Sequence, residues 1–265
     1  IKDLTAASKA VRIIYPALAD PGNPGRQLQP LVRYLRSNEL PPGETAATLR
    51  VPTLPNTLLA VVPGSWLSRE VETHAVASLH RTWAAEVQTC LEYYNDVSRV
   101  PFTLPETEHF RTQASRFWDV WWQLEPIVDD EAQWGVHYTK VSRRLEARRA
   151  TRDFRAWPIS PLANRDKDAL SGREEAIADK PWLDRARRHA HLRFRFRKGD
   201  QLGAPNLIKR VWDMAYLRRF HPAIVDGRSI TYDSVPAVAA APWLARLRVA
   251  LQQPETETAF WNFVN

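Results

Sequence analysis

The 265-residue sequence has a single cysteine and no long apolar run, and both shortages narrow the classes of protein to consider. One thiol, Cys90, cannot form a disulfide within the chain or supply a thiolate cluster for structural zinc. No apolar stretch is long enough to cross a bilayer, so we expect no membrane partner. A reducing, cytoplasmic setting is therefore the expected localisation.

Motifs for phosphoryl transfer and hydrolysis are also missing. None of the seven histidines is followed by aspartate, although metal-dependent hydrolases often use that pair. The only Asp-Asp pair, Asp129-Asp130, lacks the glycines found with such pairs in two-metal transferases. The chain has no Gly-x-x-x-x-Gly-Lys-Ser/Thr loop and no Gly-x-Ser-x-Gly motif. We expect no catalytic residue, metal or cofactor in this chain alone, although a serine nucleophile outside that motif stays open.

Positive charge is what the chain has in excess, with 37 Lys and Arg, 30 Asp and Glu and a formal net charge of +7. The excess collects from Arg143 to Arg155 and from Arg185 to Lys198, with no acid between Asp184 and Asp200. The planar guanidinium fork suits phosphate. The two segments therefore predict a polyanionic partner such as nucleic acid, and the alternative is a solvated arginine-rich surface.

The spacing of the cations indicates candidate anion-binding residues. In the first segment Arg144, Arg148 and Arg152 are four residues apart and would line one helix face. In the second segment arginine and phenylalanine alternate over 193–197, and in a strand the arginines would share one face while both phenylalanines entered the core. The candidate residues are Arg144, Arg148, Arg152, Arg193, Arg195, Arg197, Lys209 and Arg210.

Hydrophobic periodicity and turn residues predict an α+β fold. Strands are expected at 11–15, 49–63 and 117–124, and helices at 28–35, 65–94, 106–115, 131–153, 174–190, 205–220 and 237–252. Ser65, or else Ser68, is the expected N-cap of the long helix. Trp118, Trp121 and Trp122 are interpreted as core or subunit-interface residues rather than an exposed stacking platform. We expect a boundary near residue 130.

Several short motifs also occur in a characteristic order. They are Ile14-Tyr15-Pro16, Gln29-Pro30-Leu31-Val32, the Leu-Pro-Asn-Thr-Leu-Leu-Ala-Val-Val-Pro run of 54–63, Arg152-Asp153-Phe154, Leu170-Ser171-Gly172-Arg173-Glu174, the Gly-Asp-Gln-Leu-Gly-Ala run of 199–204, Lys209-Arg210 and the Ser-Val-Pro-Ala-Val-Ala-Ala-Ala-Pro run of 234–242. This series resembles the large, palm-containing subunit of type III-B CRISPR effector complexes, known as Cmr complexes.

The resemblance implies a domain organisation. In that family an HD nuclease-like domain precedes two ferredoxin-like palm domains, which flank a small, often zinc-bound helical domain, and a helical domain ends the subunit. Residues 1–130 would be the first ferredoxin-like palm, a sheet with helices on one face. Residues 131–265 would be the helical, arginine-rich domain, a degenerate counterpart of the zinc domain. We therefore expect a portion of a longer protein.

The resemblance also implies a function. The chain would be a scaffold and RNA-proximal part of a crRNA-guided antiviral ribonucleoprotein, with other Cmr subunits, crRNA and target RNA as partners. It resembles the cyclic-oligoadenylate-synthase subunit, which uses ATP and magnesium at full length, but it lacks the HD and Gly-Gly-Asp-Asp motifs. Asp168 and Ser171 stand where relatives often have zinc-binding cysteines, so no zinc is expected.

Two alternatives stay open. The chain could be the ATP-binding, non-catalytic palm of the cyclase, or an unrelated helical nucleic-acid-binding protein. No helix-turn-helix or RNA-recognition signature supports the second.

Overall fold

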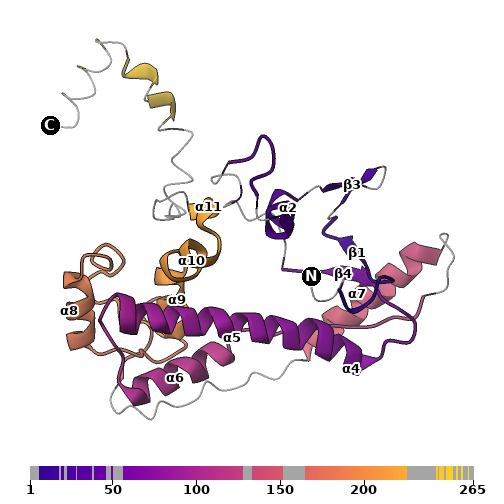
Figure 1. Cartoon of the computed structure of the whole chain (residues 1–265), viewed down its shortest axis with the longest axis horizontal. Coiled ribbons are helices and arrows are strands. Elements are labelled where there is room, and N and C mark those ends of the chain that lie inside the picture. Colours follow the sequence, from indigo (N-terminus) through magenta and orange to yellow (C-terminus); the bar gives the residue numbers. More distant parts are fainter. Residues whose placement is uncertain are drawn as a thin grey trace. The chain divides into compact units, whose positions relative to one another are not determined.

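The computed structural model of the chain is shown in Figure 1. It describes residues 6–17, 19–20, 23–27, 29–37, 39–45, 49, 56–127, 133–151 and 165–225, and eleven scattered residues between 243 and 262. The chain forms two units, Ile1–Gly227 and Arg228–Asn265. Every element below belongs to the first unit. The expected helix at 237–252 lies largely outside the described residues.

Two small antiparallel sheets lie near the start of the chain. Strand β1 (Arg12–Tyr15) pairs with β4 (Leu59–Val61), and β2 (Ala19–Asp20) pairs with β3 (Asn23–Gln27). Helix α2 (Pro30–Ser37) follows β3. The strand expected at 11–15 is confirmed. The α+β class is also confirmed, whereas the ferredoxin-like palm stays a prediction because the described residues form two-stranded sheets only.

One continuous helical stretch runs from Ser68 to Val97. It consists of α4 (Ser68–Val71), η1 (Glu72–Val76), α5 (Ala77–Glu92) and η2 (Tyr93–Val97), of which η1 and η2 are π-helical. The prediction of its N-cap was wrong, because Leu67 occupies that position. The Leu67 N–H donates to the Glu70 carboxylate at 2.8 Å, so an acid in the first turn fixes where the helix begins.

Helix α6 (Leu104–Ser115) has a start that local sequence explains. The Thr103 N–H donates to the Glu106 carboxylate at 2.9 Å, and the Glu106 N–H donates back to the Thr103 hydroxyl. This reciprocal capping box and Pro105 in the first turn place the helix start two residues before the expected one.

The segment 117–124 has no regular secondary structure, so the strand expected there was wrong. Its aromatic side chains pack on the long helix instead of forming a ladder. The rings of Phe117 and Trp118 lie 5.3 and 5.8 Å from Trp83, and the Trp122 indole N–H donates to Glu72 at 2.9 Å. Contacts with a helix therefore replace strand pairing.

The remaining elements are helices: α7 (Trp134–Ala150), α8 (Lys180–Arg188), α9 (Ala204–Trp212), η4 (Asp213–Leu217), α10 (Arg218–Phe220) and α11 (Pro222–Val225). The helices expected at 131–153 and 205–220 are confirmed. The one expected at 174–190 begins only at Lys180. Asp179 caps it by accepting the Trp182 N–H at 2.8 Å, and the preceding turn pairs Lys167 with Glu175.

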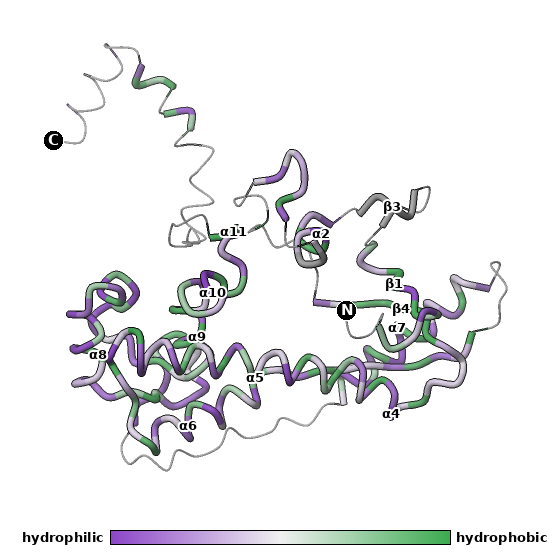
Figure 2. The backbone as a smooth tube through the Cα atoms, viewed as in Figure 1, coloured by the Kyte–Doolittle hydropathy of each residue, from purple (hydrophilic) through white to green (hydrophobic). Residues whose placement is uncertain are grey.

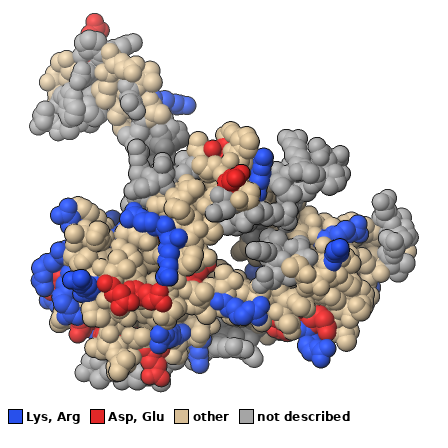
Figure 3. Space-filling model, viewed as in Figure 1, with Lys and Arg blue, Asp and Glu red and all other residues tan. Residues whose placement is uncertain are grey.

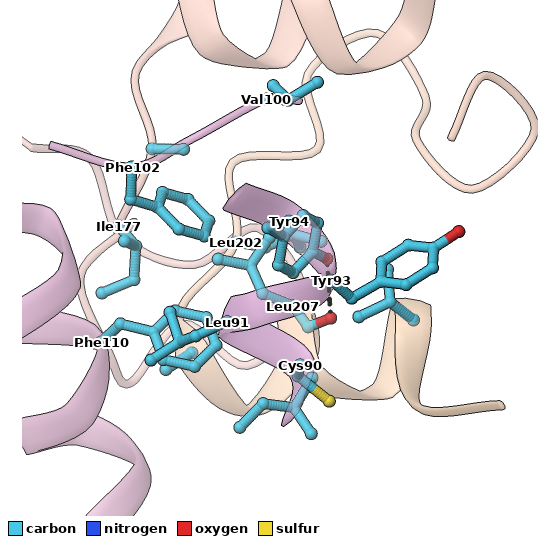
Figure 4. Packing of buried hydrophobic residues seen from close by; sticks show 14 of the residues in the cluster. Cys90, Leu91, Tyr93, Tyr94, Val100, Phe102, Phe110, Ile177, Leu202 and Leu207 are labelled. Carbon is cyan, nitrogen blue, oxygen red and sulfur yellow. Dashed lines mark hydrogen bonds between the residues drawn. The ribbon is translucent and has the colours of Figure 1, made fainter. Parts of the chain in front are cut away.

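The hydrophobic core joins the end of the long helix and α6 to residues 177–215. Trp182 stacks on Phe102 with ring centroids 4.9 Å apart and donates its indole N–H to the Val100 carbonyl. The buried Tyr94 hydroxyl donates to the Leu207 carbonyl at 2.9 Å (Figure 4). Figure 2 shows hydrophobic and hydrophilic residues alternating along α5 and α6, as one-sided burial requires. The boundary near residue 130 stays a prediction, although this core uses residues from both sides of it.

The single thiol lies inside this core. Cys90 is fully buried, and desolvation, with the Glu86 and Asp213 carboxylates nearby, raises the pKa of its thiol to about 12. Its role in the described structure is packing.

Candidate nucleic-acid interface

Helix α8 is amphipathic in a way that presents cations to solvent. Trp182, Leu183 and Ala186 are buried and fix one side of the helix to the core. Arg185 and Arg188 are three residues apart and exposed on the other side. Burial of the tryptophan anchor therefore holds these guanidinium groups at the surface.

The segment after α8 forms tight turns, so the condition under which the arginines of 193–197 would share one face, a strand, is not met. The Arg193 N–H donates to the His189 carbonyl and the Arg195 N–H to the Leu192 carbonyl, both at 2.8 Å. Turn geometry abolishes the two-residue alternation. Phe196 enters the core at 4% exposure, whereas Phe194 is 84% exposed.

The three arginines of that segment consequently have three environments. The Arg193 guanidinium lies over the Phe194 ring, 4.4 Å from its centroid. Arg195 turns inward and pairs with Asp213 at 2.6 Å. Arg197 is exposed, and its backbone N–H donates to Asp200. The three arginines therefore do not share one face, as they would in a strand.

Most cations of this region form no ion pair within the part of the chain that the structure describes. Between residues 180 and 198 the chain carries eight Lys or Arg, and two of them form ion pairs, Arg187 with Asp184 and Arg195 with Asp213. The other six are exposed and form no ion pair with a described residue. They are Lys180, Arg185, Arg188, Arg193, Arg197 and Lys198. We call this set the α8 basic surface; Figure 3 shows Lys and Arg side chains gathered over α8.

The cations of α7 are largely engaged. Lys140 lies 3.1 Å from the Glu125 carboxylate, which Arg144 also contacts. The Arg148 guanidinium lies 5.7 and 5.5 Å from the ring centroids of Trp121 and Trp122. The remaining α7 cations, Arg143 and Arg149, are exposed. Arg152 lies outside the described residues.

The two arginine-rich segments lie toward opposite ends of the long helix. Arg148 of α7 stacks on Trp122, and the Trp122 indole N–H donates a hydrogen bond to Glu72 near the start of the long helix. Trp182 of α8 packs on Tyr94 near the helix end, with ring centroids 5.5 Å apart. A rise of 1.5 Å per residue separates Glu72 from Tyr94 by about 33 Å. The structure therefore does not gather the candidate residues into one site (Figure 1).

The last two candidates lie on α9. Arg210 pairs with Asp200 at 3.0 Å, so its charge is already balanced. Lys209 is exposed, with its amine 5.7 Å from the Phe117 ring centroid. Sequence reasoning missed Lys180, Arg185, Arg188 and Lys198 as site residues. Arg185, Arg188 and Lys198 lie in the acid-free stretch between Asp184 and Asp200, which was visible in the sequence.

The turn in which zinc-binding cysteines were considered is held by a buried carboxylate. Asp168, 2% exposed, accepts the Leu170, Ser171 and Gly203 N–H groups and the Asn206 amide. Burial alone would raise the pKa of Asp168, but these hydrogen bonds outweigh it and lower that pKa. Within the described ranges no group of three or more His, Cys, Asp or Glu could hold a metal, and the absence of zinc stays a prediction.

No family model, curated protein or solved structure gives a significant match to this chain. In the part of the chain that the structure describes, every helix is too short or too polar to cross a bilayer.

Proposed function

We propose that this chain is an RNA-binding scaffold that uses the α8 basic surface to hold single-stranded RNA. The observation that carries the proposal is the set of six exposed cations that form no ion pair with a described residue, held in place by the buried face of α8. Uncompensated guanidinium groups at such density favour a phosphate backbone.

A single strand fits this surface better than a duplex. Phe194 is the most exposed ring beside the cations, and Arg193 already stacks on one of its faces. An unpaired base can stack on an aromatic ring next to a basic groove, whereas bases in a duplex are already stacked. Binding should be salt-sensitive and only weakly sequence-selective, because phosphates carry no sequence information.

The motif series places this role in a type III-B CRISPR ribonucleoprotein, with crRNA, target RNA and other Cmr subunits as cytoplasmic partners and residues 1–130 as a first palm. The two residues that lead into the motif of 170–174 pack on the motif of 199–204 in the structure. The Ala169 N–H donates to the Gln201 carbonyl at 2.7 Å, and Asp168 binds the Gly203 N–H. Segments at two places in the motif series thus pack together in the folded chain, which supports the proposal.

Fluorescence anisotropy with a labelled single-stranded RNA of about 12 nucleotides, over about 50 to 400 mM NaCl, tests RNA binding. Each phosphate neutralised on a single strand contributes a slope of about −0.7 in log K against log salt, so six cations predict about −4. A flat response would overturn the proposal.

Two charge-matched variants locate the surface. Replacing Arg185, Arg193, Arg197 and Lys198 with alanine should reduce the slope to about −1.4. Replacing Arg143, Arg144, Arg148 and Arg149 with alanine removes the same charge from α7 and should change the slope less. Equal losses in the two variants would contradict the assignment to α8. Co-purification of crRNA and Cmr subunits with the tagged full protein tests the complex, and their absence would remove the CRISPR assignment.

A further inference from the structure

A cavity of about 410 Å³ opens beside the turn that follows α8, and this volume lies in the range of small-ligand pockets. Its lining comes from three parts of the chain: Glu92, Tyr93 and Asp96 at the end of the long helix, His191 after α8, and Met214 and Arg218 in η4 and α10. Three segments that are distant in sequence therefore come together to line the cavity.

The cavity and the α8 basic surface share a structural element. His191 lines the cavity and lies two residues before Arg193. The ion pair between Arg195 and Asp213 ties the same turn to the residue that precedes Met214. The cavity is thus fixed relative to the cations that are proposed to bind phosphate.

The cavity lining combines a carboxylate and a guanidinium with an aromatic ring and a thioether. The Asp96 carboxylate and the Arg218 guanidinium are exposed, and neither forms an ion pair with a described residue. The neighbouring Glu92 is engaged, because it pairs with Arg219 at 3.1 Å. The Tyr93 hydroxyl contacts the Met214 sulfur at 3.4 Å. Figure 4 shows the Tyr93 ring pointing away from the other labelled core residues.

We propose that this cavity receives one guanine nucleotide of the bound RNA strand, an inference that rests on the proposed function. Guanine presents its N1–H and amino group side by side, and these two donors match the two oxygens of the Asp96 carboxylate. The purine ring packs on Tyr93 and Met214, and its phosphate lies toward Arg218 and His191. Uracil has one N–H between two carbonyl oxygens, and those oxygens repel a carboxylate.

Binding of two strands measures the preference. One is an all-uridine RNA of about 12 nucleotides, and the other carries a single central guanosine. The guanosine strand should bind about fivefold more tightly or better, which corresponds to one bidentate base contact. Asp96→Asn should abolish that ratio while the all-uridine strand keeps its affinity and salt slope. Asp119→Asn removes another exposed carboxylate and should leave the ratio unchanged.

The outcomes separate the two proposals. Equal affinity for both strands, or a ratio that survives Asp96→Asn, overturns the guanine site and leaves RNA binding intact. Failure of both strands to bind overturns RNA binding and the guanine site together. GMP alone should bind at least about tenfold more weakly than the guanosine strand, because it lacks the neighbouring phosphates. GMP binding as tight as the strand would overturn the inference that the occupant belongs to RNA.

Discussion

Helices α7 and α8 begin the two arginine-rich segments of the chain, yet their surroundings differ. None of the described α7 residues is buried, and Glu125 and two tryptophans engage three of its five cations. Helix α8 buries three residues in the core, and six cations from Lys180 to Lys198 form no ion pair with any residue that the structure describes. Charge density alone does not mark a binding surface. What matters is whether the protein has already neutralised the charge and anchored the element that carries it.

Substitution of Trp182, which anchors α8 in the core, should have the largest effect on the free energy of unfolding. Trp182→Ala removes a fully buried indole that stacks on Phe102, and it should lower the free energy of unfolding by about 3–5 kcal/mol. Trp134→Ala on α7 removes an indole that is 38% exposed and should cost less than about 1 kcal/mol. Urea unfolding followed by circular dichroism measures both. Similar losses would erase the contrast between the two helices.

A substitution in the turn that leads into α8 should have the next largest effect on the free energy of unfolding. Asp168→Ala leaves the Gly203 N–H and its neighbours without their acceptor in a buried position, at a cost of about 1–3 kcal/mol. Asp166→Ala truncates an exposed carboxylate two residues earlier and serves as the control. A neutral Asp168→Ala would show that water replaces the carboxylate and that the turn is not held as the contacts indicate.

The ion pairs of the two segments should differ in strength. Arg195→Ala disrupts a largely buried pair with Asp213 and should cost about 1.5–3 kcal/mol. Arg144→Ala should cost about 0–1 kcal/mol, because Arg144 is half exposed and Lys140 still contacts Glu125. Thermal unfolding of both variants in low salt compares them. A larger loss for Arg144→Ala would reverse the ranking.

Lowering the pH into the mildly acidic range should have the smallest effect on stability. It acts through a buried histidine of α6, in the core on which α8 packs. Burial lowers the pKa of His109, with Arg165 adding to the decrease and Glu175 opposing it. The folded state therefore favours neutral imidazole, while the unfolded chain takes up a proton below about pH 6.5. Stability should be constant above that value and fall as the pH drops toward the lowered pKa.

Melting temperatures between about pH 8 and 5.5 test this dependence. His109→Gln should flatten the slope only in part, because burial also lowers the pKa of His221. An unchanged slope in His109→Gln would assign the pH dependence to other groups.

Local sequence was sufficient where local contacts decide the structure. The helices expected at 106–115 and 205–220 are present as α6 and α9 to α10, and the start of α6 follows from a capping box between Thr103 and Glu106, which are three residues apart. Aromatic content misled over 117–124, because Phe117 and Trp118 pack on Trp83 of the long helix instead of pairing in a strand. Alternation over 193–197 did not produce a strand, because the Arg195 N–H donates to the Leu192 carbonyl in a turn.

The same division applies to the candidate site. The scarcity of acids after Asp184 was visible in the sequence. The ion pair of Arg195 joins residues 18 apart, and the cavity joins the end of the long helix to Arg218, so neither could be inferred from spacing.

Because Cys90 is buried, its thiol is poorly reactive toward labelling reagents. A thiol with a pKa of about 12 stays protonated at neutral pH and reacts slowly with maleimides. A cysteine introduced at an exposed position such as Phe194 would then carry a dye or spin label almost alone. The native background therefore suits site-specific spectroscopy without prior removal of its own sulfhydryl.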